Sequence, residues 1–182
     1  MARNTIFTKE ILLKESVEYI RNFGIDKFNI RDLSKYVGCS TQPFFKYYNN
    51  LDEFKIDLKT YLHLDYENFI NKYIDKDHYL YTISYAYALY AKMEPNIFKA
   101  LFITDLAGSR TIDEVLNTDR NIKTIEALMK EFNITKNKAN KVYRDVRFYT
   151  HGIATQLCIK SINIDENELS KLISNNIIVN IK

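Results

Sequence analysis

Residues 28–54, FNIRDLSKYVGCSTQPFFKYYNNLDEF, predict two short helices joined by a glycine turn. The first helix, 30–37, has an apolar stripe at i, i+3 and i+7: Ile30, Leu33 and Val37. Asn29 is placed to cap this helix, since Asn is a preferred N-cap residue, and Gly38 is expected to end it.

The second helix, expected at 41–48, carries groups that suit contact with DNA. Ser40 can cap it, and Pro43 falls in its first turn, where a missing amide hydrogen costs little. Three apolar residues are expected to share its buried face: Phe44, Tyr48 and Leu51. Its outward face offers hydroxyls, an amide, an ammonium and a phenol: Thr41, Gln42, Lys46 and Tyr47. Such a face is unusual for plain solvated surface and suits a major groove and its phosphates.

The remaining sequence predicts further helices and no strands, which is an all-α fold. Glycine and proline are scarce, four and two residues, and half of these six lie between positions 24 and 43, so short elements are expected there and longer helices beyond. Helix 8–23, capped by Thr8 and ended by Gly24, completes a three-helix unit. Longer helices are expected from Asp52 onward and at roughly 79–93, 96–107, 111–132, 136–161 and 165–180.

The composition is typical of a globular protein with a hydrophobic core. The apolar content of 46% is enough to form a hydrophobic core in 182 residues. The net charge of +3 comes entirely from residues 1–50, which hold eight Lys and Arg against five Asp and Glu. No apolar run approaches the ~18 residues of a membrane span and no secretory signal is present, so we expect a cytoplasmic protein with no membrane partner. Cys39 and Cys158 are expected to be small buried hydrophobes, with a redox-sensitive thiol as the alternative.

These elements resemble the TetR family of bacterial transcriptional regulators. The resemblance is strongest over residues 8–58, which follow the order of the family's first four helices. The matching segments are FG at 23–24, DKFNIRDLSKYVGCS at 26–40 and TQPFFKYYNNLDEFK at 41–55. The stretch YAKMEPNIFKALF and the pair His151-Gly152 resemble the family's ligand domain more loosely. The resemblance implies a helix-turn-helix DNA-binding domain at 1–50 and a helical ligand-binding and dimerisation domain at 51–182. It also implies a homodimeric regulator, most often a repressor, which a small-molecule effector releases from its double-stranded DNA operator.

The resemblance also implies which residues contact DNA. Arg31 would reach a base or the backbone, and Thr41, Gln42 and Pro43 would lie nearest the bases. Gln42 could pair bidentately with adenine, Pro43 and Phe45 could touch thymine methyls, and Lys46 and Tyr47 would contact phosphates. Phe45 and Leu51 depart from the family's usual tyrosine and lysine, so one phosphate contact is missing or passes to Lys55. The full candidate set is Asn29, Arg31, Ser40, Thr41, Gln42, Pro43, Phe45, Lys46, Tyr47 and Lys55.

Two further sets of residues are expected in the C-terminal part. The apolar residues of the last two helices look too numerous for one edge of a small bundle, which favours a four-helix bundle with a second copy; an ordinary intramolecular hairpin is the alternative. The expected interface residues are Val142, Val146, Ile153, Leu157, Leu169, Leu172, Ile173 and Ile177. Gly152 and Ala154 would allow close approach there.

Aromatic residues are concentrated between positions 61 and 102, which suits a cavity for an apolar or aromatic small molecule; core packing is the alternative. The expected ligand residues are Tyr66, Phe69, Tyr87, Tyr90, Phe98, Phe102 and His151. A ligand there would tilt the helix that begins near Asp52 and change the separation of two recognition helices in a dimer.

No catalytic or metal-binding pattern is found. The three histidines, His63, His78 and His151, are far apart in the sequence, and none lies beside a nucleophile or a ligand partner. We therefore expect no cofactor, no metal and no enzymatic activity. The alternative to a DNA-binding regulator is a helical protein-interaction or adaptor module, in which residues 28–54 form only a tight helix corner.

Overall fold

The computed structural model describes residues 7–104, 106, 108 and 111–182, and these residues form helices joined by turns, with no strand. The expected all-α fold is confirmed. The chain divides into two compact units: unit 1 contains Met1–Tyr66 and Asn96–Ala107, and unit 2 contains Glu67–Pro95 and Gly108–Lys182. Each unit is described by itself below.

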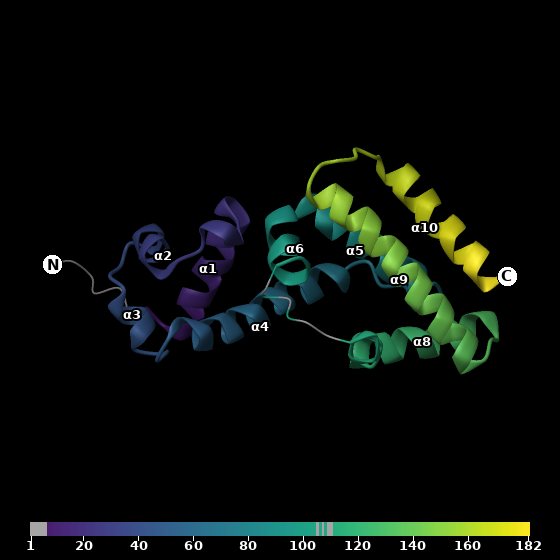
Figure 1. The fold of residues 1–182 in the computed structure, drawn as a ribbon, viewed down its shortest axis with the longest axis horizontal. Helices are drawn as coiled ribbons and strands as arrows, with labels where there is room; N and C mark the ends of the chain where they lie inside the picture. Colours follow the sequence, from purple (N-terminus) through teal and green to yellow (C-terminus); the bar gives the residue numbers. More distant parts are fainter. Residues whose placement is uncertain (1–6, 105, 107, 109–110) are drawn as a thin grey trace. The chain divides into compact units, whose positions relative to one another are not determined.

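Unit 1 contains the N-terminal helices (Figure 1): α1 (Lys9–Phe23), α2 (Ile30–Val37), α3 (Gln42–Phe45), α4 (Leu51–Ile70) up to Tyr66, and α6 (Pro95–Phe102) from Asn96. A short 3-10 turn, Ile25–Lys27, joins α1 to α2. The predicted caps of α1 and α2 are confirmed, because Thr8 accepts a hydrogen bond from the Ile11 amide and Asn29 accepts one from the Asp32 amide. The prediction of Ser40 as the cap of α3 was wrong, because Thr41 occupies that N-cap position. Gly38 ends α2 in the left-handed conformation, with φ 77°.

Helix α3 is shorter than the predicted 41–48. It ends at Phe45, and the amides of Tyr47 and Tyr48 both donate to the Phe44 carbonyl in the turn that follows. The reason lies in the two asparagines before α4. Asn50 accepts a hydrogen bond from the Glu53 amide, and the Glu53 carboxylate accepts one from the Asn49 amide. Because Asn side chains compete with helical backbone bonding, these contacts start α4 at Leu51 and leave no room for a longer α3.

An aromatic cluster centred on Phe54 forms the core beneath α2 and α3. The Phe54 side chain is 1% exposed, and three rings surround it: Phe28 is stacked at 5.9 Å between centroids, and Phe44 and Tyr48 meet it edge-on at 5.5 and 5.0 Å. Phe28 precedes α2, Phe44 lies on α3 and Tyr48 follows α3. Phe54 therefore holds the whole helix pair against the first turn of α4.

Unit 2 contains the end of α4 and the helices α5 (Tyr79–Met93), α7 (Ile112–Leu116), α8 (Asp119–Phe132), α9 (Lys136–Cys158) and α10 (Glu166–Ile181). Helix α9 packs along α5, α8 and α10, and α10 also contacts α5 (Figure 1). Small buried residues allow α5 and α9 to approach: Ala86, Ala88, Ala91 and Ala154.

The prediction of one helix over 111–132 was wrong. The structure has α7 and α8 instead, separated at Thr118, whose ψ of 150° is extended backbone. Thr111 caps α7 with a full capping box, in which Glu114 hydrogen-bonds back to the Thr111 amide. A helical period continues through this break, so the periodicity alone did not reveal it. The second threonine, Thr118, was the missed N-cap signal.

Two glycines in different backbone conformations give a matched pair of stability predictions. Gly38→Ala is expected to lower the free energy of unfolding by about 1–2 kcal/mol, because a Cβ is strained at positive φ. The space itself is open, since no described atom lies within 4 Å of an added Cβ. Gly152 lies inside α9, and the space around an added Cβ is open there as well. Gly152→Ala is therefore expected to raise the free energy of unfolding by about 0.5–1 kcal/mol. Urea denaturation followed by circular dichroism measures both changes, and equal signs would contradict this account of Gly38.

Candidate functional site

The helix pair α2–α3 presents the residues expected to contact DNA, and none of them is buried. Six are exposed: Asn29, Arg31, Ser40, Gln42, Phe45 and Lys46. Four are partly exposed: Thr41, Pro43, Tyr47 and Lys55. The opposite sides of the two helices are anchored in the core by Leu33 and Phe44, which are 0% and 1% exposed. The fold therefore fixes which side of the pair faces outward.

Gln42, Phe45 and Lys46 form one continuous patch, called here the α3 face. They are spaced i, i+3 and i+4, so they are neighbours on the surface of a helical turn. The Phe45 ring is 58% exposed, although a large apolar side chain gains free energy from burial. The Lys46 ammonium lies 5.4 Å from the centre of the Tyr47 ring. The α3 face thus combines an amide, an apolar ring and a positive charge.

Asn29 and Tyr47 have structural roles that the sequence did not show in full. Asn29 accepts from the Asp32 amide at 2.9 Å, and its own amide group donates to the Asp32 carboxylate and to the Lys27 carbonyl. The Tyr47 hydroxyl donates to the Phe7 carbonyl at 3.1 Å. A hydroxyl has one hydrogen to donate, so the phosphate contact expected of Tyr47 would require this bond to break. Both side chains position the pair before any ligand is bound.

The charges around the α3 face are mixed. Lys55 lies 3.9 Å from Asp52, and Lys35 lies 3.5 Å from Asp32. The hydrogen bond from Asn29 lowers the pKa of Asp32, and Lys35 and Arg31 lower it further. Lys35 was not among the expected residues, yet it is exposed and lies one turn after Arg31 on α2. Its i, i+4 spacing from Arg31 was the signal that identifies it as an additional candidate for phosphate contact.

The expected ligand residues fall into two clusters, one in each unit. In unit 1, Phe102 packs against Tyr66 at 5.1 Å and against Phe98 at 5.0 Å between ring centroids. Phe98 is fully buried. Tyr66 is also buried and Phe102 is partly exposed, so two of the three rings agree with the alternative of core packing.

In unit 2, the ring of Tyr90 is fully buried and lies 5.0 Å from Phe69. The Tyr87 hydroxyl lies 2.8 Å from Nδ1 of His151. Burial, and secondarily the charge of Arg147, lowers the pKa of His151. The imidazole is therefore held neutral near pH 7, so it acts as a hydrogen-bonding partner of Tyr87 without a charge.

The residues expected at a dimer interface lie in the core of a single chain. Seven of the eight are at most 8% exposed, and Leu172 is partly exposed. They are Val142, Val146, Ile153, Leu157, Leu169, Leu172, Ile173 and Ile177. Packing among α5, α9 and α10 of one chain covers most of these side chains, which agrees with the alternative of an intramolecular hairpin. Other apolar residues of α9 and α10 are exposed: Phe148, Tyr149, Ile178 and Val179.

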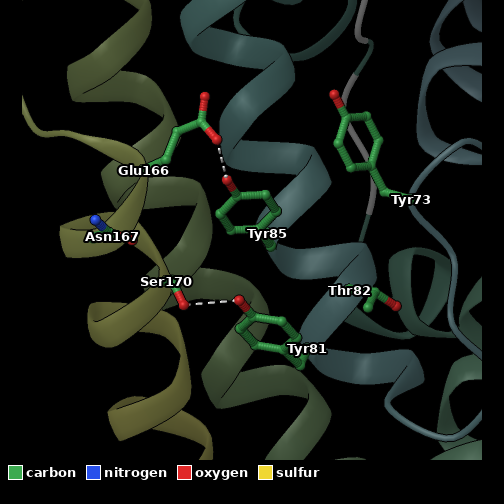
Figure 2. Close-up of a pocket in the computed structure, with 7 residues that line it drawn as sticks. All are labelled: Tyr73, Tyr81, Thr82, Tyr85, Glu166, Asn167 and Ser170. Atoms are coloured by element: carbon green, nitrogen blue, oxygen red, sulfur yellow. Dashed lines mark hydrogen bonds between the residues drawn. The ribbon is translucent and has the colours of Figure 1, made fainter.

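A pocket of about 380 Å³ lies in unit 2, between α5, the segment before it and the first turns of α10. We call it the tyrosine pocket; it is lined by Tyr73, Tyr81, Thr82, Tyr85, Glu166, Asn167 and Ser170 (Figure 2). None of these residues was in the expected ligand set. The i, i+4 spacing of Tyr81 and Tyr85 was an available signal, but nothing in the sequence places Glu166 beside them.

The described residues show no metal site and no membrane span. No group of three or more His, Cys, Asp or Glu is arranged there to hold a metal ion. No helix in the same part of the chain is both long and apolar enough to cross a bilayer. Cys158 is buried, with its thiol 3.2 Å from the Pro95 carbonyl, and Cys39 is partly exposed. Cys158 thus fits a small buried hydrophobe better than Cys39 does.

Comparison with known proteins adds no relative. No protein-family model matches this sequence, and no curated protein matches it either. The resemblance to TetR regulators therefore stays a prediction that rests mainly on residues 8–58.

Proposed function

We propose that this protein is a TetR-like DNA-binding transcriptional regulator, a repressor that a small-molecule effector releases from its operator. The observation that carries the proposal is the exposure of the α3 face while Phe44, on the other side of the same short helix, is anchored against Phe54. An exposed amide, aromatic ring and ammonium on a rigidly held helix are what major-groove contact requires. The 58% exposed ring of Phe45 beside them supplies an apolar surface that a thymine methyl can contact.

In the proposed complex, α3 enters the major groove. Gln42 pairs with adenine through its amide, and the Phe45 ring contacts thymine methyls. Lys46 contacts phosphate, which fixes the position of the helix without reading sequence. Arg31 and Lys35, one turn apart on the exposed side of α2, add positive charge toward the backbone.

The regulator is proposed to act as a homodimer. Half-sites on DNA repeat about one turn apart, near 34 Å, so two recognition helices must hold a fixed separation. The exposed apolar residues of α9 and α10, Phe148, Ile178 and Val179 among them, support association with a second copy. An effector acts by favouring a conformation with a different separation. An effector that binds tightly and leaves operator affinity unchanged would contradict this coupling.

The decisive experiment is nuclease protection by the purified full-length protein on the DNA that flanks its own gene. Protection of two half-sites about one turn apart, with affinity that falls steeply as salt rises, is the expected result, because each neutralised phosphate releases counterions. A monomer that shows no salt-dependent binding to DNA would overturn the proposal and favour a protein-interaction module.

Gln42→Ala tests the base contact. It is expected to weaken binding to the protected site by about 1–3 kcal/mol and to relax the preference at one base pair. Competition binding with a set of single-base variants of the site measures both effects. A uniform loss on every sequence would show that Gln42 contacts the backbone and would contradict the assignment.

Lys46→Ala tests the phosphate contact. It is expected to weaken binding to all sequences alike and to reduce the slope of log affinity against log salt by about one. The matched control is Lys141→Ala, which removes an exposed lysine from α9 in unit 2. The two variants carry the same net charge, so an equal change in salt slope would mean that overall charge, not the α3 face, determines binding.

A further inference from the structure

We propose that the tyrosine pocket binds an organic cation, such as a substituted ammonium group. Binding is a property of unit 2 and stands whether or not unit 1 binds DNA. The proposal rests on three features of the pocket, namely its aromatic surfaces, its charge and the hydrogen bonds that hold its lining in place.

The first feature is the grouping of three phenol rings. Tyr81 and Tyr85 are nearly parallel, with centroids 6.0 Å apart, and Tyr73 lies 6.5 Å from Tyr85 at a steep angle. Tyrosine rings attract cations because the face of the ring carries partial negative charge. All three rings line the same pocket, so a single ligand there lies within reach of more than one ring.

The second feature is the charge of the lining. Glu166 is the only acidic side chain among the described residues that line the pocket, and no Lys, Arg or His belongs to this lining. Two further acidic residues lie beside it in the sequence: Asp165, the N-cap of α10, and Glu168, in the first turn of the helix. The Glu166 carboxylate would attract a cationic ligand, whereas an anionic ligand would meet it as a like charge.

The third feature is the set of hydrogen bonds that orient the pocket before a ligand arrives. The Tyr85 hydroxyl donates to Oε2 of Glu166 at 3.0 Å, and the Tyr81 and Ser170 hydroxyls lie 2.8 Å apart (Figure 2). Thr82 is fixed by a hydrogen bond from the Asp75 amide. Burial, then the hydrogen bond and charge of Glu166, raises the pKa of Tyr85 to about 12. Tyr85 therefore stays protonated in a negative field that a bound cation would relieve.

The pocket has the volume of a small-ligand site and is open to solvent on the side of Glu166 and Asn167. Its volume of about 380 Å³ lies at the lower end of the range of ligand pockets. The ring faces are apolar, and the polar atoms of Glu166, Asn167 and Ser170 lie together on α10 (Figure 2). An inorganic cation needs a cage of several oxygen ligands, whereas a substituted ammonium needs ring faces with one carboxylate. The lining fits the second description.

The test uses full-length protein with choline as the probe and its neutral isostere, 3,3-dimethylbutan-1-ol, as the comparison. Binding is followed by NMR titration of the tyrosine ring resonances. We expect saturable shifts with choline and binding at least about threefold weaker for the isostere, because the two differ only in charge. Equal affinity for the two compounds, or no saturation with choline, would overturn the proposal.

Two variants on the same turn of α10 test whether choline binds beside Glu166. Glu166→Gln keeps an acceptor for Tyr85 but removes the charge, and it is expected to weaken choline binding by about three- to tenfold. Glu168→Gln removes the same charge two residues away, where the side chain is exposed and outside the lining, and is expected to leave binding unchanged. Equal losses in both variants would show a general charge effect and would overturn the site.

Tyr85→Leu tests the role of the rings. It removes a ring face and is expected to weaken choline binding as well; unchanged binding would exclude a role for the rings.

Discussion

Phe54→Ala is expected to lower the free energy of unfolding of unit 1 by about 3–5 kcal/mol, the cost of removing a buried phenyl ring from a packed core. The side chain is 1% exposed and is surrounded by the rings of Phe28, Phe44 and Tyr48. Its loss leaves a cavity at the point where the segments before α2 and after α3 meet α4. Since a small domain is stable by about 5–15 kcal/mol in total, much of that margin is lost.

The measurement is native-state hydrogen exchange, which reports the opening free energy of α2 separately from that of unit 2. The matched control is Ile56→Ala, two residues along α4 with a side chain that is 67% exposed, where a change within about 0.5 kcal/mol is expected. If Phe54→Ala affects exchange in α2 no more than Ile56→Ala does, the cluster does not anchor the helix pair. The proposed DNA binding would be lost with the anchor, because α3 would no longer be held with its outward face defined.

Local signals in the sequence predicted much of unit 1. Thr8, Asn29 and Gly38 act at helix ends through contacts within three or four residues, so their types and spacing were sufficient to place α1 and α2. The exposed side of α3 followed from the spacing of Phe44 and Tyr48, which are both buried. The break at Thr118 was missed because hydrophobic periodicity continues across it, and only a cap distinguishes the two helices.

Features that depend on distant residues could not be predicted in the same way. The bond between Tyr47 and the Phe7 carbonyl spans forty residues, and the Tyr85–Glu166 bond spans eighty-one. A run of apolar residues on α9 and α10 shows that something covers them, but it does not say whether this is α5 or a second copy. The structure shows that Val142 and Ile173 are buried within one chain. The aromatic content between residues 61 and 102 likewise gave no means to separate core rings from pocket rings.

Tyr90→Ala tests whether Tyr90 is a core residue or lines a ligand cavity. Tyr90 is the largest fully buried side chain in the described part of the protein. If Tyr90 is a core residue, its truncation to alanine is expected to lower the free energy of unfolding by about 3–5 kcal/mol. The reason is that its ring fills space beside Phe69, 5.0 Å away between centroids, and the chain around a 0% exposed residue relaxes only in part. As the wall of an empty ligand cavity, the same ring would lack neighbours on one side, and its removal would cost far less.

Urea denaturation of the full chain measures the difference, and Met93→Ala serves as the control on the same helix. Met93 is 59% exposed, so its truncation is expected to change stability by no more than about 0.5 kcal/mol. A loss for Tyr90→Ala as small as that for Met93→Ala would contradict the core role and return Tyr90 to the candidate ligand residues. A large loss assigns the ring to the scaffold of unit 2. Partly exposed tyrosines can then still meet a ligand, among them Tyr87 of the expected set and Tyr73, Tyr81 and Tyr85, which line the pocket beside Glu166.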